Sequence, residues 1–171
     1  MKTHTLHAMR PALTGIVLLV SIGAAGGAIT ITNNVTQNAG IFTYTYTVTN
    51  FGTTFDLALV EIPIGVGVSI SNLTAPTGFA AITDGAPVNS VTFFEDTDGS
   101  TLQTFAPGSS QGVFSYTSSF GPAPVTASAL DANGDTYTTT TFSPVPEPSS
   151  LLLFGAAAVP WIISRRRRIH G

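Results

Sequence analysis

The stretch Ile41–Asn50, which reads IFTYTYTVTN, decides the fold class of this chain. Threonine occupies every odd position from 43 to 49. The even positions carry aromatic or β-branched residues: Phe42, Tyr44, Tyr46 and Val48. Successive side chains of a strand point to opposite faces of its sheet. The alternation therefore predicts a half-buried β-strand with one apolar and one hydroxyl face.

Further segments on both sides show the same two-residue period or a short apolar run. They are Ile29–Thr32, Phe55–Ile62, Val66–Leu73, Phe79–Thr83, Ser90–Phe94, Gly112–Ser118, Val125–Leu130 and Thr136–Phe142. Asp-Gly or Asn-Gly pairs at 84–85, 98–99 and 133–134 supply tight turns between them. Many short strands without a helical period predict an all-β domain, a single antiparallel β-sandwich over residues 29–142.

The run YTYTVTN, followed by FGTTFDLALVEIPIG, resembles the immunoglobulin-like repeats of bacterial surface proteins. The resemblance implies an immunoglobulin-like type of sandwich. The chain shows no internal repeat, so we expect a single module.

Charge is strongly segregated along the chain. The six basic residues lie in the two terminal segments, and no Lys or Arg occurs between Pro11 and Ser164. The nine acidic residues fall between Asp56 and Glu147. Nucleic acid is therefore not an expected partner, because its phosphates need cations.

Catalytic side chains are scarce between residues 29 and 142. That part of the chain contains no His, Cys, Lys or Arg, which excludes triad nucleophiles, Schiff-base lysines and histidine-bound zinc there. Two carboxylates can hydrolyse glycosides, and Glu61 and Glu95 are the only glutamates in this part. Solvated loop carboxylates are the simpler interpretation, so we expect a protein that is not an enzyme.

Two acidic loops raise the question of calcium, although we expect no cofactor otherwise. Calcium takes six to eight oxygen ligands, which alternate loop residues can deliver. The candidate ligands are Asp96, Asp98, Asp131, Asn133 and Asp135. Neither loop matches the full EF-hand pattern, and ordinary turn chemistry is the simpler explanation of both.

The N-terminus has the order of features found in secretory signal peptides. Lys2 and Arg10 precede a short apolar run from Leu13 to Ile22, and small residues follow. We expect a signal peptide over residues 1–25, with cleavage after Ala25. An N-terminal membrane anchor is the alternative, but its apolar run is short for a span.

The C-terminus combines three features in a fixed order. Pro146, Glu147 and Pro148 form a tripeptide that the prolines keep extended. An almost wholly apolar run then predicts a transmembrane helix over residues 151–164. A basic tail over residues 165–171 follows, and it contains Arg165, Arg166, Arg167 and Arg168. The positive-inside rule places these arginines in the cytoplasm, with residues 143–150 as a Pro-rich linker outside.

This tail resembles the PEP-CTERM sorting signal. The resemblance implies recognition by exosortase, an integral membrane protease, with processing at or near Pro146-Glu147-Pro148. It also implies an inner-membrane intermediate whose body lies outside the cytoplasm, and later release or attachment at the cell surface. A permanent single-pass tail anchor is the alternative.

Together these features predict an exported, non-enzymatic surface or matrix protein. The resemblance to the PEP-CTERM signal further implies an association with exopolysaccharide or biofilm. The Sec translocon, signal peptidase, exosortase and the inner membrane are its expected partners. A second hypothesis is an extracellular carbohydrate-binding module that binds polysaccharide through exposed aromatic residues, with calcium as a candidate cofactor. Phe51, Phe94 and Phe120 are the aromatics least easily assigned to a core.

Overall fold

The computed structural model describes residues 16–17, 28–84, 89–96 and 103–146. Within them the chain forms strands and no helix. The strands are β1 (Ile16–Val17), β2 (Ile29–Asn38), β3 (Ile41–Asn50), β4 (Leu57–Pro63), β5 (Ile70–Thr74), β6 (Phe79–Asp84), β7 (Ser90–Glu95), β8 (Ser110–Ser118), β9 (Pro122–Asp131) and β10 (Thr136–Pro144).

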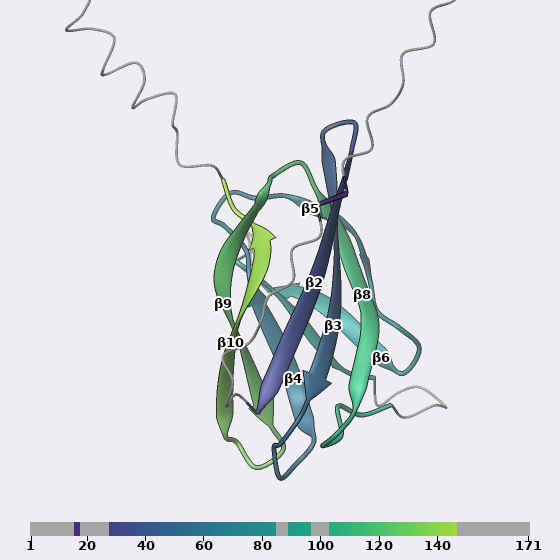
Figure 1. Ribbon diagram of the computed structural model, residues 1–171, viewed down its shortest axis with the longest axis vertical. Helices are drawn as coiled ribbons and strands as arrows, with labels where there is room; N and C mark the ends of the chain where they lie inside the picture. The colour runs from purple at the N-terminus through teal and green to yellow at the C-terminus, as the bar shows by residue number, and fades with distance from the viewer. Residues whose placement is uncertain (1–15, 18–27, 85–88, 97–102, 147–171) are drawn as a thin grey trace, which may run out of the picture.

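The strands form two antiparallel sheets that pack face to face (Figure 1). The first sheet has the order β1-β2-β3-β8-β5, and the second has the order β10-β9-β4-β7-β6. Strands β2 and β10 contact each other along one side of the sandwich, and β5 contacts β6 along the other. The predicted all-β class and the sandwich-like arrangement are therefore confirmed.

Each of the nine segments expected to be strands overlaps one observed strand, with differences at the ends. Strand β2 continues past Thr32 to Asn38, and β10 continues past Phe142 to Pro144. The first two residues expected to be linker are thus paired in the second sheet, where Pro144 lies opposite Pro122. Strand β1 lies within the segment expected to be the signal peptide and pairs with β2 at Val35 and Thr36.

A two-residue turn joins β2 to β3 and fixes their register. Ala39 and Gly40 form this turn with φ angles of 50° and 82°. Such left-handed pairs match the twist of antiparallel strands, and Gly adopts them without steric cost. Pairing then runs without interruption from Asn38 opposite Ile41 to Ile29 opposite Asn50.

The core lies between the two sheets and is rich in aromatic rings. Tyr44, Tyr46 and Val48 of β3 are buried, as the alternation with threonine predicts. The rings of Phe93 and Phe114 stack at 4.5 Å between centroids, so the two sheets meet through aromatic contact. Of the three aromatics hard to place from sequence, Phe51 is 67% exposed, while Phe94 and Phe120 are half-buried.

Membrane-spanning structure is a separate question from this fold. Within the described residues no helix has the length and apolar character needed to cross a bilayer. The helix expected over residues 151–164 lies outside the described residues, as do the basic tail and most of the expected signal peptide.

Candidate functional site

Pro146, the first residue of the tail tripeptide, packs against the sandwich. Beyond β10, the amide of Gly65 donates to the carbonyl of Pro144 at 3.0 Å, and the amide of Val145 donates to the carbonyl of Gly121 at 3.2 Å. A Cβ at Gly65 would collide with Cδ of Pro146 and would lie 2.9 Å from Cα of Val145. The chain therefore leaves the fold at Pro146 through a close backbone contact that only glycine permits.

We expect Gly65→Val to displace this exit segment. The added side chain meets the backbone at Val145 as well as the proline ring, so rotation of one side chain cannot relieve the clash. Such overpacking costs about 1–3 kcal/mol of folding free energy. Thermal unfolding should show a lower Tm, and limited proteolysis should cut near residues 144–146 sooner than in the wild type.

Gly52→Ala is the matched control for that variant, because an added Cβ at Gly52 meets nothing within 4 Å. It should leave both the Tm and the digestion pattern unchanged. Equal protection of residues 144–146 in Gly65→Val and wild type would show that the exit segment is not held at Gly65.

A buried hydroxyl network fastens β10 to the first sheet. The Tyr46 hydroxyl donates to the carbonyl of Phe142 at 2.8 Å, and the Asn33 side-chain amide donates to the same carbonyl at 3.2 Å. Since Tyr46 has only one hydrogen to donate, the Tyr116 hydroxyl donates to Tyr46 across 2.6 Å. Ser143 extends the network to Tyr116 at 3.4 Å. The C-terminal end of β10 is thus fixed by pairing within the second sheet and by hydrogen bonds from the first sheet.

Burial keeps these phenols protonated. Loss of hydration raises the pKa of Tyr116 to about 12, although its bonds to Ser143 and Tyr46 act in the opposite direction. Burial also raises the pKa of Tyr46 well above its ordinary value, and the neighbouring Tyr116 adds to that shift. The network therefore remains a neutral set of hydrogen bonds throughout the physiological pH range and offers no acid–base group for catalysis.

The β9–β10 turn brings together three of the five candidate calcium ligands. Oδ1 of Asp131 accepts the amides of Asn133 and Asp135, both at 2.9 Å. Oδ2 of Asp131 accepts the Tyr137 hydroxyl at 3.0 Å. Both oxygens of the buried carboxylate are thus used by the turn itself, which is the pattern of an Asx turn.

The second acidic loop is described only in part. Asp96 follows β7 and donates its amide to the carbonyl of Gly78, whereas Asp98 lies outside the described residues. Among the described residues, no group of three or more His, Cys, Asp or Glu side chains is arranged to hold a metal ion. Calcium binding therefore stays a prediction that rests on the composition of the two loops.

The turn carboxylate makes stability depend on pH. Burial by itself would raise the pKa of Asp131, but hydrogen bonds from Asp135, Tyr137, Asn133 and Gly134 lower it below its usual range. A carboxylate with a lowered folded-state pKa stabilises the fold above the unfolded-state value of about 4. That stabilisation is lost as the pH falls through the folded-state pKa.

We accordingly expect Asp131→Asn to lower the Tm at neutral pH, because an amide NH₂ cannot accept the Tyr137 hydroxyl. The difference from wild type should shrink below a pH of about 4, where the wild-type carboxyl also becomes neutral. Thermal unfolding followed by circular dichroism between acidic and neutral pH measures both effects. Asp135→Asn, at an exposed position of the same turn, is the control; a gap that does not change with pH would contradict the assignment.

The two body glutamates are placed on opposite faces of the second sheet. Glu61 lies in the middle of β4, opposite Thr92 on the outer face. Glu95 ends β7, and its Oε1 accepts the amide of Phe105 at 3.3 Å. Burial raises the pKa of Glu95, the bond from Phe105 lowers it, and nearby Asp56 raises it again. The paired-carboxylate hypothesis needs both groups in one cleft, and this placement separates them.

The outer face of the first sheet carries rows of hydroxyl and amide groups, which we call the hydroxyl grid. Cross-strand pairing aligns Thr36, Thr43, Thr117 and Ser71 in one row, Asn34, Thr45, Ser115 and Thr74 in the next, then Thr32 with Thr47, and Thr30, Thr49 and Ser110. Hydroxyls of neighbouring strands bond to each other, for example Thr74 with Ser115 at 2.8 Å. None of these side chains is charged, so the hydroxyl grid is polar and neutral.

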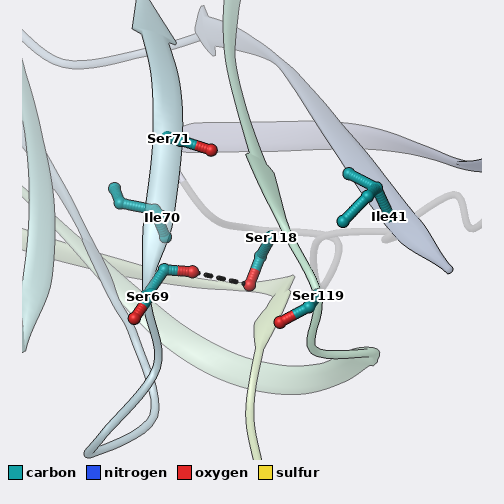
Figure 2. Close-up of a pocket in the computed structure, with 6 residues that line it drawn as sticks. All are labelled: Ile41, Ser69, Ile70, Ser71, Ser118 and Ser119. Atoms are coloured by element: carbon teal, nitrogen blue, oxygen red, sulfur yellow. Dashed lines mark hydrogen bonds between the residues drawn. The ribbon is translucent and has the colours of Figure 1, made fainter.

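One shallow pocket of about 200 Å³ lies beside the exit segment (Figure 2). Its wall consists of Ile41, Ser69, Ile70, Ser71, Ser118 and Ser119. The Ser118 hydroxyl donates to the carbonyl of Ser69 at 2.9 Å, which ties β8 to the segment before β5. The pocket contains no titratable group, so it offers contact surface rather than chemistry.

Most of the residues predicted to carry the sorting function lie outside the described residues. These are Ala25, Glu147, Pro148, Arg165, Arg166, Arg167 and Arg168. Pro146 is described, and its contact with Gly65 could not be anticipated, because no sequence pattern links positions so far apart.

Comparison with known protein families identifies one motif in the chain. Residues 144–168 match the PEP-CTERM protein-sorting motif, which begins at the last residue of β10. No curated protein and no solved structure matches the chain. The chain therefore carries a PEP-CTERM sorting motif, which marks a protein that is exported through the membrane to the cell surface or beyond and has exosortase as its kind of partner.

Proposed function

We propose that this chain, a carrier of the PEP-CTERM sorting motif, is a non-enzymatic structural protein of the cell surface or extracellular matrix. The observation that carries the proposal is the motif at residues 144–168, joined without a spacer to a compact β domain. The composition of residues 29–142 also supports a non-enzymatic role. This part of the chain contains no His, Cys, Lys or Arg, which are the usual nucleophiles, bases and electrophiles of enzymes. A role in an exopolysaccharide or biofilm matrix is part of this proposal.

The proposed route has two membrane steps. The N-terminal signal peptide directs the chain to the Sec translocon, and signal peptidase removes it after Ala25. The apolar run at 151–164 then holds the chain as a single-pass intermediate in the inner membrane. Arg165 to Arg168 stay in the cytoplasm, and the β domain, an immunoglobulin-like module, lies outside. Exosortase finally processes the chain at or near Pro146-Glu147-Pro148.

The test is to recover the protein from cells that contain exosortase and from otherwise identical cells that lack it. Intact mass spectrometry of the recovered protein fixes both ends of the mature chain. We expect loss of the segment after the motif and transfer to the surface or medium only when exosortase is present. Identical mass and location in both cell types would refute the proposal.

A second candidate function is binding of neutral extracellular polysaccharide, and the hydroxyl grid is the observation that favours it. Hydroxyl and amide side chains at strand spacing offer donors and acceptors to sugar hydroxyls, and the uncharged face repels neither neutral nor anionic polymers. Exposed Phe51, at the end of β3, adds an apolar surface on which a sugar ring can stack.

A polysaccharide array separates this candidate from a purely structural role. Thr45→Lys places a charge in the middle of the hydroxyl grid, and Phe51→Ala removes the exposed ring. Saturable binding that both variants weaken would support the candidate. Thr138→Lys is the control, because Thr138 is exposed on the other sheet. Absence of saturable binding by the wild type would dismiss it.

A further inference from the structure

The loops around the exit segment form one continuous surface, which we call the exit end. It consists of residues 38–41, 65–69, 118–122 and 144–146. Gly65 bonds to Pro144, and Val145 bonds to Gly121, so two of these loops hold the outgoing chain directly. The pocket joins Ile41 to Ser69 and Ser118, which links the β2–β3 turn to the same surface. Figure 1 shows these turns together at the upper end of the sandwich.

The exit end is uncharged and partly apolar. None of its residues is Asp, Glu, Lys or Arg. Val66 is 73% exposed and Ile41 is 46% exposed, although both are aliphatic. One described carboxylate, Asp84, lies at the same end of the second sheet as these loops, because Asp84 pairs with Ser90 and Ser90 pairs with Pro63. Aliphatic side chains that project from a neutral surface are suited to a partly apolar, water-poor environment.

The opposite end of the sandwich collects acidic residues. Glu95 lies close enough to Asp56 for the charge of Asp56 to raise its pKa. Asp56 in turn accepts the amide of Ala132 in the β9–β10 turn. The described carboxylates at this end are Asp56, Glu95, Asp96, Asp131 and Asp135. Five of the seven described carboxylates therefore lie at the end of the sandwich away from Pro146, while Glu61 lies within β4 and Asp84 lies at the end of β6 nearer the exit end.

The tether between the exit end and the apolar run is short. Only four residues, numbers 147–150, separate Pro146 from Leu151. Even fully extended, four residues span at most about 14 Å. Once the apolar run enters a bilayer, the exit end must lie at or very near the headgroups, whichever conformation the tether adopts.

We propose that the exit end rests on the lipid surface, with Val66 and Ile41 inserted at the boundary between headgroups and acyl chains. This inference relies on the membrane step of the proposed function. Burial of exposed aliphatic side chains favours the contact, and no charge at the exit end opposes it. Anionic headgroups repel the acidic end and so favour the same orientation. The contact keeps the tripeptide that begins at Pro146 level with the membrane surface, where a membrane-embedded protease can reach it.

Site-specific fluorescence on the full chain tests this orientation. The chain has no cysteine, so Val66→Cys and Asn133→Cys each create a single labelling site, at the exit end and at the acidic end respectively. The labelled full chain is reconstituted into vesicles of phosphatidylethanolamine and phosphatidylglycerol. Nitroxides on the lipid headgroups then quench any label that lies at the membrane surface. We expect quenching at position 66 to exceed quenching at position 133 several-fold.

Trp161 provides an independent reading of tail insertion, because it is the single tryptophan and lies in the apolar run. Lipids brominated on the acyl chains should quench its fluorescence in both labelled proteins. If Trp161 is quenched while positions 66 and 133 are quenched equally, the lipid contact is refuted and the membrane step stands. If Trp161 is not quenched, the membrane step itself fails, and the contact fails with it.

A charge variant tests the role of the two aliphatic side chains. Val66→Glu combined with Ile41→Glu, in a chain labelled through Ser119→Cys, should reduce headgroup quenching several-fold without affecting Trp161. Unchanged quenching at position 119 would refute insertion of these side chains. Self-quenching between labels at position 66 on neighbouring chains, without quenching by lipid, would assign the exit end to a second copy and would also overturn the proposal.

Discussion

Replacement of Pro146, Glu147 and Pro148 together by alanine is expected to leave the full-length chain in the membrane fraction of cells that contain exosortase. We expect the two prolines to favour an extended tripeptide, since proline fixes φ and restricts the residue before it. Three alanines would instead favour extension of the helix that we expect over residues 151–164 towards the sandwich. An extended, accessible substrate segment with a carboxylate at its centre would thus be lost. Cell fractionation and intact mass of the recovered protein measure the outcome.

The matched control replaces Ser149 and Ser150, the two residues after the tripeptide, by alanine. This variant keeps the prolines and the glutamate, so processing should proceed as in the wild type. The body should fold equally well in both variants, because its strands end at Pro144. Normal processing of the triple-alanine chain would show that the tripeptide is not what the protease recognises.

Phe114→Ala is expected to have the largest effect on stability of any single change considered. Phe114 is fully buried. The distance between ring centroids is 4.5 Å to Phe93, 5.4 Å to Phe79 and 5.8 Å to Phe105. Truncation leaves a cavity where the two sheets meet and costs about 3–5 kcal/mol. Since small domains are stable by only about 5–15 kcal/mol, a substantial part of the stability would be lost. Urea unfolding gives the difference directly.

Val113→Ala, at the adjacent position of β8, is the control for that measurement. Val113 is 57% exposed, so its truncation should change the free energy of unfolding by less than about 0.5 kcal/mol. A loss at Phe114 no larger than at Val113 would show that the aromatic cluster is not the core of the fold. Cells that express Phe114→Ala should also yield less exported protein, because an unstable domain is more readily degraded.

The strands were predictable because most of them bury the side chains of one face and expose those of the other face to solvent. In β3 the alternation of Tyr44 and Tyr46 with threonine identifies the inward side chains from sequence alone. The alternation of apolar and polar residues does not identify β2 beyond Thr32, because Asn33 and Asn34 are poor strand formers. Their extension depends on partners from elsewhere: Asn33 bonds to the carbonyl of Phe142, and the turn at Ala39 and Gly40 returns the chain onto β3.

The candidate site divides in the same way. The tripeptide, the apolar run and the arginines are contiguous, so a linear pattern was sufficient to find them, and the motif match at residues 144–168 agrees. The contact between Pro146 and Gly65 was not predictable, because the two positions are brought together only by the pairing of the second sheet. The same holds for the network of Tyr46, Tyr116 and Ser143.

The sequence by itself determined the all-β class, the order of the strands along the chain and the sorting motif, since each depends on side chains that are neighbours in the chain. Only the tertiary structure decided which strands are adjacent, that the fold continues to Pro146, and that uncharged loops gather around residues 144–146 while five of the seven described carboxylates gather at the other end. These features depend on contacts between distant segments. Such contacts are fixed by the packing of the two sheets around one aromatic core, and no local pattern encodes them.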